Sequence, residues 1–271
     1  SLNLKYNLNE KNSLRLGASK TYTLPQAKEI SPYRYVGVNF NSQGNPNLKP
    51  SDNYNLDLKW DFNLTLTELI SLTAFYKLIK NPISRIEVAS AGGYLSYENI
   101  ADKATVAGVE IEIRKNLFVR PVSNAAHGMN KLSLGLNGSY IYTNAKMPLA
   151  TVTTGSQLEG AAPWIVNFDL SHNFTKGERS FVNTLVLNYV SDKIYTIGTQ
   201  GYQDMMEQGV LTLDFVSQAK LNKHLSLNLK ARNLLNPSYK LSRKANENGE
   251  KVILNDYKKG INISLGVSCT F

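Results

Sequence analysis

Hydrophobic and polar residues alternate along most of this chain with a period of two. In the segment NYNLDLKWDF (53–62) the apolar residues are Tyr54, Leu56, Leu58, Trp60 and Phe62, and the residues between them are polar. The segments KLSLGLNGSYIY (131–142) and HLSLNLKARNLL (224–235) repeat the pattern. Successive side chains of a β-strand point to opposite faces, so the pattern predicts strands with one apolar and one polar face. Helical periodicity is almost absent.

About eleven segments of this kind are predicted to form strands. They lie near residues 2–8, 13–23, 53–62, 69–79, 104–117, 131–142, 163–174, 181–192, 208–221, 224–235 and 256–271. Many are roughly ten residues long, which is the length that a tilted strand needs to cross a lipid bilayer.

The connections between these segments alternate in length. The short ones are 9–12, 175–180 and 222–224, and the long ones, rich in Pro, Gly and Asn, are 24–50, 81–103, 144–162, 193–207 and 237–255. The join at 118–130 departs from the alternation because it is longer than a tight turn. Strands joined in this way form an antiparallel meander with tight turns at one end and long loops at the other.

The composition of the two faces favours a membrane barrel. The polar faces are rich in Asn, Ser, Thr and Gly, which suits a hydrated interior, and aromatic residues lie toward strand ends. Those aromatic residues are Tyr22, Trp60, Tyr76, Tyr142, Trp164 and Tyr189. We therefore predict an all-β fold: part of an antiparallel, up-and-down transmembrane β-barrel with long outer loops and short periplasmic turns.

The charge limits which partners are expected, and the cysteine content limits which disulfides and metal sites are possible. The net charge of +9 is spread along the chain without a block of like charges. Scattered charge is typical of a solvated surface and also suits acidic membrane lipid, and no nucleic-acid partner is expected. A single cysteine allows no internal disulfide and no cysteine-based metal site.

Four segments resemble the C-terminal barrel of TonB-dependent outer-membrane receptors. They are GNPNLKPSDNYNLDLKWDF (44–62), YENIADKATVAGVEIEI (97–113), ARNLLNPSY (231–239) and ISLGVSCTF (263–271), in the family's order. In the first segment, Pro46 and Pro50 fix the backbone on either side of Asn47–Lys49, which predicts a structural cap between a loop and a strand.

The resemblance implies a location in the outer membrane of a Gram-negative bacterium. Family members have a 22-stranded barrel around an N-terminal plug. An odd number of strands does not close a bacterial single-chain barrel, and the chain starts inside a strand pattern. We therefore expect residues 1–271 to be the C-terminal part of the barrel, with the plug and the first half of the barrel absent.

The resemblance also implies partners. Phe271 is expected to be the recognition signal for the barrel-assembly machinery, because such barrels end on an aromatic residue. The TonB complex would act through the missing N-terminal region, and outer-membrane lipid and lipopolysaccharide would surround the wall.

The function that the resemblance implies is TonB-energised uptake of a scarce extracellular solute, such as a ferric siderophore, cobalamin, a glycan or a peptide. Exposed aromatic residues of the long loops offer stacking and amphipathic contact to such ligands. The candidate contacts are Tyr33, Tyr35, Phe40, Tyr94, Tyr97, Tyr195 and Tyr202. The excess of Lys and Arg favours an anionic ligand, and no cofactor or resident metal is expected.

Enzymatic activity is not predicted. His127, His172 and His224 lie on different expected elements, and Cys269 is on an apolar face with no histidine nearby. The sequence has no G-x-S-x-G, P-loop, G-x-G-x-x-G or H-E-x-x-H motif. Two alternatives stay open at this point: a passive porin-like channel, and a soluble β-sandwich that serves in binding or adhesion.

The alternation finally predicts the facing of individual side chains in the last two strands. Leu227, Leu229, Ile263 and Leu265 are expected to face lipid, and Asn228, Lys230, Asn262 and Ser264 to face the interior.

Overall fold

The computed structural model describes residues 1–90, 93–122, 128–147, 155–245 and 249–270. Phe271 and His127, both considered above, lie outside the described residues.

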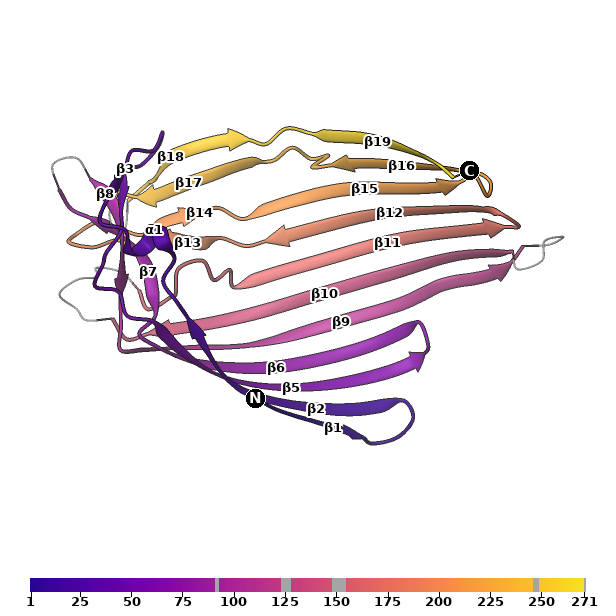
Figure 1. Cartoon of the computed structure of the whole chain (residues 1–271), viewed down its shortest axis with the longest axis horizontal. Helices are drawn as coiled ribbons and strands as arrows, with labels where there is room; N and C mark the ends of the chain where they lie inside the picture. The colour runs from indigo at the N-terminus through magenta and orange to yellow at the C-terminus, as the bar shows by residue number, and fades with distance from the viewer. Residues whose placement is uncertain (91–92, 123–127, 148–154, 246–248, 271) are drawn as a thin grey trace.

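A single antiparallel sheet of eleven strands forms one wall, in which every strand pairs with the next strand of the meander (Figure 1). Its order is β1 (Leu2–Asn7), β2 (Asn12–Thr23), β5 (Ser51–Thr65), β6 (Glu68–Lys80), β9 (Lys103–Pro121), β10 (Met129–Ala145), β11 (Trp164–Lys176), β12 (Arg179–Val190), β15 (Val210–Lys220), β16 (Leu225–Arg232) and β19 (Asn262–Cys269). The predicted fold class and strand number are confirmed. Of the described residues of the join at 118–130, those at 118–121 and 129–130 are in strands, because β9 and β10 extend into it from both sides.

The register of the wall keeps its two faces separate. Leu136 lies opposite Phe168, Phe168 opposite Leu187, and Leu187 opposite Leu213, so one row of apolar side chains crosses four strands. The next row toward the loops, on the opposite face, is polar: Asn137, Asn167 and Asn188 lie side by side. Leu227 and Leu229 share their face with Val267 and Leu265, while Asn228 and Lys230 share the other face with Gly266 and Ser264.

The described parts of the long loops contain eight short strands that the sequence pattern does not predict. Those of one four-stranded sheet are β3 (Arg34–Tyr35), β4 (Ser42–Gln43), β8 (Tyr94–Asn99) and β7 (Ile83–Val88), and those of the other are β13 (Lys193–Thr196), β14 (Met205–Glu207), β17 (Ser238–Lys244) and β18 (Lys251–Lys258). One short helix, α1 (Ala27–Ile30), accompanies them. Both loop sheets lie at the same end of the wall, opposite the short turns (Figure 1).

The predicted boundary of the last strand is wrong at its start. Residues 256–258 belong to the loop strand β18, and the wall strand β19 begins at Asn262. Gly260 separates the two strands with a φ of 80°, a backbone conformation that glycine adopts without steric cost. The apolar residues on either side of the break, Tyr257 and Ile261, keep the same odd-numbered phase, so the pattern alone does not reveal it.

The buried apolar core lies at the loop end of the molecule, where loop residues pack against the ends of the wall strands β9 and β10 at Ala104 and Ala145. Its larger cluster consists of Ile86, Ile100, Ala101, Ala104, Ala145, Leu158, Ile194 and Ile197, and a smaller one of Leu95, Met205 and Leu241. The wall is one layer thick, and its apolar face carries exposed side chains such as Leu58 and Leu72. A sheet of this kind needs lipid to cover that face, which distinguishes it from a soluble sandwich of two packed sheets.

No helix among the described residues is long and apolar enough to cross a membrane.

The two outer strands of the wall, β1 and β19, each have a neighbour on one side only. Every residue of both strands is exposed. Unpaired backbone groups of this kind are not tolerated in hydrocarbon, so both edges must find partners in a membrane.

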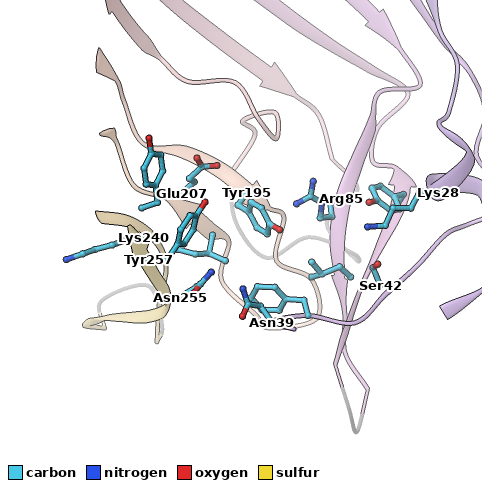
Figure 2. Close-up of a pocket in the computed structure, with 14 residues that line it drawn as sticks. Lys28, Asn39, Ser42, Arg85, Tyr195, Glu207, Lys240, Asn255 and Tyr257 are labelled. Atoms are coloured by element: carbon cyan, nitrogen blue, oxygen red, sulfur yellow. The ribbon is translucent and has the colours of Figure 1, made fainter. Parts of the chain in front are cut away.

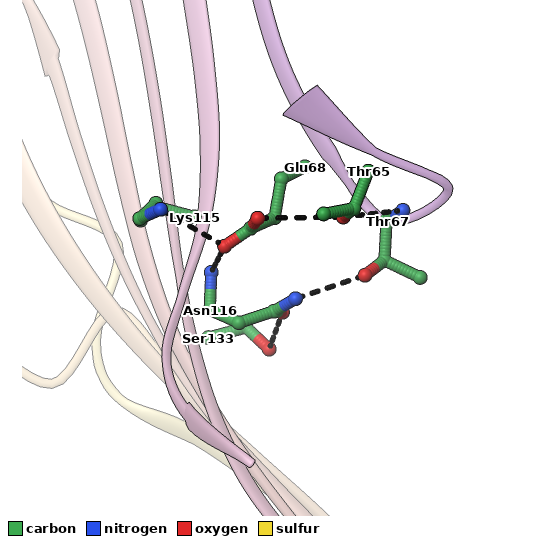
Figure 3. Close-up of polar contacts among 6 residues, drawn as sticks. All are labelled: Thr65, Thr67, Glu68, Lys115, Asn116 and Ser133. Carbon is green, nitrogen blue, oxygen red and sulfur yellow. Dashed lines mark hydrogen bonds and ion pairs between the residues drawn. The ribbon is translucent and has the colours of Figure 1, made fainter. Parts of the chain in front are cut away.

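At the turn end of the wall, the Glu68 carboxylate serves as the hydrogen-bond partner of β9 beyond the last residue that β6 pairs with it (Figure 3). The ladder between β6 and β9 ends at Leu69, while β9 continues. The Glu68 carboxylate accepts a hydrogen bond from the backbone N–H of Asn116 at 3.1 Å and lies 3.2 Å from Lys115 Nζ. The Asn116 side chain donates to Thr67 Oγ1 at 2.9 Å. These contacts satisfy a backbone donor that has lost its strand partner.

The facing of β16 gives a direct test. We expect Leu229→Arg to destabilise the folded barrel by about 2–4 kcal/mol, because it places a charge on the lipid face, and Asn228→Arg to cost much less. The measurement is urea unfolding in lipid vesicles of the receptor that carries this chain. Equal, small effects of the two substitutions would show that the facing of this strand is assigned wrongly.

Candidate ligand-binding site

A cavity of about 590 Å³ lies between the two loop sheets (Figure 2). Its lining comes from α1, from the segment 39–42, from β7 and β8 of one sheet, and from β13, β14, β17 and β18 of the other. Segments far apart in the sequence therefore meet around one space at the end of the barrel that carries the long loops.

Aromatic rings from both sheets line the cavity. The rings of Phe40 and Tyr195 have their centroids 6.4 Å apart at an angle of 41°, and the rings of Tyr239 and Tyr257 are stacked at 5.5 Å. Phe40 and Tyr195 also pack against the smaller loop core, which fixes their positions. Tyr97 also lines the cavity, and burial raises the pKa of its hydroxyl.

One guanidinium group occupies a central place in the cavity. Arg85 lies over the ring of Tyr195, 4.4 Å from its centroid, and 3.4 Å from the carboxylate of Glu159. The backbone N–H of Arg85 donates to the same carboxylate at 2.6 Å. Burial raises the pKa of Glu159, against the opposing effects of that N–H and of the guanidinium. Glu159 thus holds Arg85 in a fixed position, with its cation against an aromatic face.

The other charged side chains give the lining a cationic excess. Lys28 and Lys240 line the cavity together with one acid, Glu207. Lys240 lies 3.8 Å from Asp256, and Glu207 lies 3.4 Å from Lys193. Among the described residues, no ion pair involves Lys28.

A buried ion pair joins the two sheets behind the cavity. Glu87 of β7 pairs with Arg243 of β17, and both side chains are mostly buried. The hydroxyl of Thr199 donates to the carbonyl of Glu87. Next to it, Ile86 and Ile197 form an isolated parallel bridge between the same two regions. The distance between the sheets, and with it the width of the cavity, is therefore set by contacts within the protein.

The segment 44–50 closes the base of the first long loop. The Asn45 side chain donates to the carbonyl of Tyr97 at 3.0 Å, and the side chain of Asn99 accepts from the N–H of Lys49 at 2.8 Å and donates to its carbonyl at 3.0 Å. A side chain at Gly44 would meet the carbonyl oxygens of Ser31 and Lys28 at 2.4 and 2.6 Å. The prediction of a structural cap is confirmed. The same hydrogen bonds join the motif at 44–62 to the motif at 97–113.

The seven aromatic residues predicted from the sequence divide into two groups. Phe40, Tyr97 and Tyr195 line the cavity, whereas Tyr33, Tyr35, Tyr94 and Tyr202 do not. Tyr33 is strongly exposed, and Tyr94 lies in a smaller recess that borders Phe40. The lining residues that the sequence pattern misses include Arg85, Tyr239 and Tyr257. Tyr257 falls in the segment 256–271, which the pattern predicts as a wall strand. Arg85 lies in a long loop, and nothing in the sequence around it distinguishes it from other loop residues.

The two histidines that the structure describes lie on the wall, near its turn end. His172 Nε2 is 2.8 Å from Asn130 Oδ1, and His224 Nδ1 is 2.7 Å from the carbonyl oxygen of Thr270. No group of three or more His, Cys, Asp or Glu side chains that could hold a metal ion occurs in the described ranges.

Comparison with known proteins identifies the class. The family described as "TonB dependent receptor-like, beta-barrel" matches residues 1–234, and the chain belongs to this family. It is therefore part of a TonB-dependent receptor barrel of the Gram-negative outer membrane. This result, together with the fold, displaces the porin and sandwich alternatives.

Individual relatives agree with this class. The chain is 25% identical over 219 residues to the iron-regulated outer membrane virulence protein of Vibrio cholerae, a match that covers 77% of this chain and 31% of the relative. The ferric enterobactin receptor of Pseudomonas aeruginosa has the same fold, with a TM-score of 0.62 and 16% identity over 99% of this chain and 40% of that chain. A copper transporter, OprC, gives a TM-score of 0.66 and 14% identity over 98% and 39%. The chain thus spans about a third of its curated relative's length.

The ion pair between the sheets yields a prediction for the loops. We expect Glu87→Gln to weaken the association of the loop sheets by about 3 kcal/mol, because it leaves the cation of Arg243 buried without its partner. The rate of proteolysis within β13–β14 and β17–β18 measures the effect. The double variant Glu87→Gln/Arg243→Met is expected to recover much of the loss. If the single and double variants were cleaved at the wild-type rate, the ion pair would have no part in joining the sheets.

Proposed function

We propose that residues 1–271 are the C-terminal part of the barrel of an active-transport receptor, whose plug and first barrel strands lie in the rest of a longer protein. The chain covers 31% of its curated relative and about 40% of similar receptor structures, which supports this division. The open edges at β1 and β19 require further strands to close the barrel.

The receptor would bind a scarce extracellular solute, and a ferric siderophore fits the site best. The observation that carries this proposal is the cavity of about 590 Å³, whose lining combines aromatic rings with an excess of cations. Aromatic faces suit the flat groups of an organic chelator, and Arg and Lys suit its negative charge. The names of two relatives, an iron-regulated outer membrane protein and a ferric enterobactin receptor, agree with iron as the cargo.

Residue roles follow from the geometry. Arg85 and Tyr195 would form the central contact, with the cation held by Glu159 against the ring. The stacked pair Tyr239 and Tyr257 would contact the opposite side of the ligand. The predicted aromatic residues outside the cavity would receive the ligand on its way in; they are Tyr33, Tyr35, Tyr94 and Tyr202.

Release into the periplasm would depend on the TonB complex, acting through the N-terminal region. In this scheme the described loops bind the ligand, and the ligand then passes through the interior of the barrel. The polar inner face, with rows such as Asn137, Asn167 and Asn188, would line that path and contact the plug.

Binding of a ferric catecholate to the full-length receptor tests the proposal. We expect Tyr195→Ala and Arg85→Met each to raise the dissociation constant about tenfold or more, because each removes a side chain from the centre of the site. The control is Tyr189→Ala, which removes an aromatic ring on the lipid face of β12. Unchanged affinity in both site variants, at equal surface levels, would contradict the assignment of this cavity.

A further inference from the structure

The charge of Arg85 is balanced by a carboxylate that a ligand in the cavity does not have to touch. Arg85 lines the cavity, whereas Glu159 is not part of the lining. The guanidinium lies 3.4 Å from the carboxylate, and only 24% of the Arg85 side chain and 19% of the Glu159 side chain are exposed. A ligand can therefore reach a guanidinium whose charge is already offset from within the protein.

The backbone on both sides of Glu159 is anchored. The N–H of Leu158 donates to Thr143 Oγ1 at 3.1 Å, and the N–H of Gly160 donates to the carbonyl of Ile194 at 2.9 Å. Gly160 has a φ of 76°, which lets the chain turn directly after Glu159 without steric cost. The carboxylate is thus a built part of the site and not a chance contact of a surface side chain.

The other charged side chains of the lining are also paired, with one exception. Lys240 lies next to Asp256, and Glu207 lies next to Lys193, so the charges of each pair cancel. The exception in the described part of the lining is Lys28, which no ion pair involves. The cavity therefore presents several cationic groups but little uncompensated positive charge.

This arrangement affects charged and neutral ligands differently. A ligand anion next to Arg85 is attracted by the guanidinium and repelled by the Glu159 carboxylate, and salt screens charges in a partly buried site less than charges in solution. Removal of the carboxylate would strengthen the net attraction in proportion to the negative charge of the ligand. A neutral ligand would experience no such change.

We propose that Glu159 limits the negative charge that the cavity accepts, and thereby determines which iron chelates the receptor selects. The inference rests on the proposed function, because it takes the cavity to be the ligand site. Glu159 acts through Arg85: the pair keeps a flat hydrogen-bond donor against the ring of Tyr195 while it offsets the charge of that donor. A multiply charged chelate is disfavoured relative to a neutral chelate by the repulsion from the carboxylate.

Two chelates of different charge, bound to the full-length receptor, test the proposal. The probes are a ferric tris-catecholate, which carries three negative charges, and a neutral ferric trihydroxamate. We expect Glu159→Gln to lower the dissociation constant of the anionic chelate about tenfold and to leave that of the neutral chelate within about twofold. The amide oxygen of Gln can still accept the N–H of Arg85, so the anchoring of the segment is kept. In the double variant Glu159→Gln/Arg85→Met, the gain for the anionic chelate is expected to disappear.

The matched control is Asp192→Asn. Asp192 accepts a backbone N–H at 2.6 Å, from Gly209, just as Glu159 does from Arg85, and it pairs with a cation, Lys251, at 3.9 Å. It does not line the cavity or contact Arg85. This variant removes the same charge from the loops and is expected to leave the affinity for both chelates unchanged.

The possible failures are distinguishable. If Arg85→Met weakens binding but Glu159→Gln leaves the affinity for the anionic chelate unchanged, the inference is overturned and the assignment of the cavity stands. An equal gain or an equal loss for both chelates in Glu159→Gln would also overturn it, because charge would then not be the cause. If Arg85→Met changes the affinity for neither chelate, the assignment of the cavity fails, and this inference fails with it.

Discussion

The structure depends on one constraint: hydrocarbon offers a backbone N–H or C=O no partner, so each strand of the wall must find its partners in its neighbours. The simplest solution is a meander in which consecutive strands pair, and the eleven strands of the wall follow it without a crossover. β6 begins at Glu68, while its neighbour β9 extends further toward the turn end. There the Glu68 carboxylate accepts the hydrogen bond of the Asn116 N–H, which has no strand partner. Lipid then covers the apolar face, and the polar face is turned to the interior.

The same constraint explains where the buried core lies. A wall one layer thick has no second layer to pack on, so the apolar residues that protein alone buries are in the described loops and at the ends of wall strands that the loops cover, such as Ala104 and Ala145. The loop sheets form from pairs of segments that leave the wall at different places, and the Glu87–Arg243 pair holds the sheets together. The cavity between them is therefore a built space with fixed aromatic and cationic lining, formed without a ligand.

The wall could be predicted from the sequence because its signal is periodic and local. Strands such as 53–62 and 131–142 show their two faces in the order of their residues alone. The loop strands β3, β4, β13 and β14 carry no such signal, because they have only two to four residues. Several loop strands also pair with distant segments. The parallel bridge between Ser42 and Leu95 is one example, and that between Ile86 and Ile197 another. Phe40, Tyr97 and Tyr195 are predicted as ligand contacts because they are aromatic residues in long loops. The positions of Arg85 and Tyr257 in the cavity depend on tertiary contacts, which the alternation of apolar and polar residues does not encode.

Hydrogen exchange of the ligand-free receptor tests most directly whether the loops are a preformed part of this β-architecture. Backbone amides of β7, β8, β13 and β17 are predicted to exchange slowly, within about tenfold of the amides of the wall strands β10 and β11, because both groups sit in paired ladders. Exchange of the loop strands as fast as that of the exposed segment 36–38, with protection only after ligand is added, would show that the cavity forms on binding and would contradict this account.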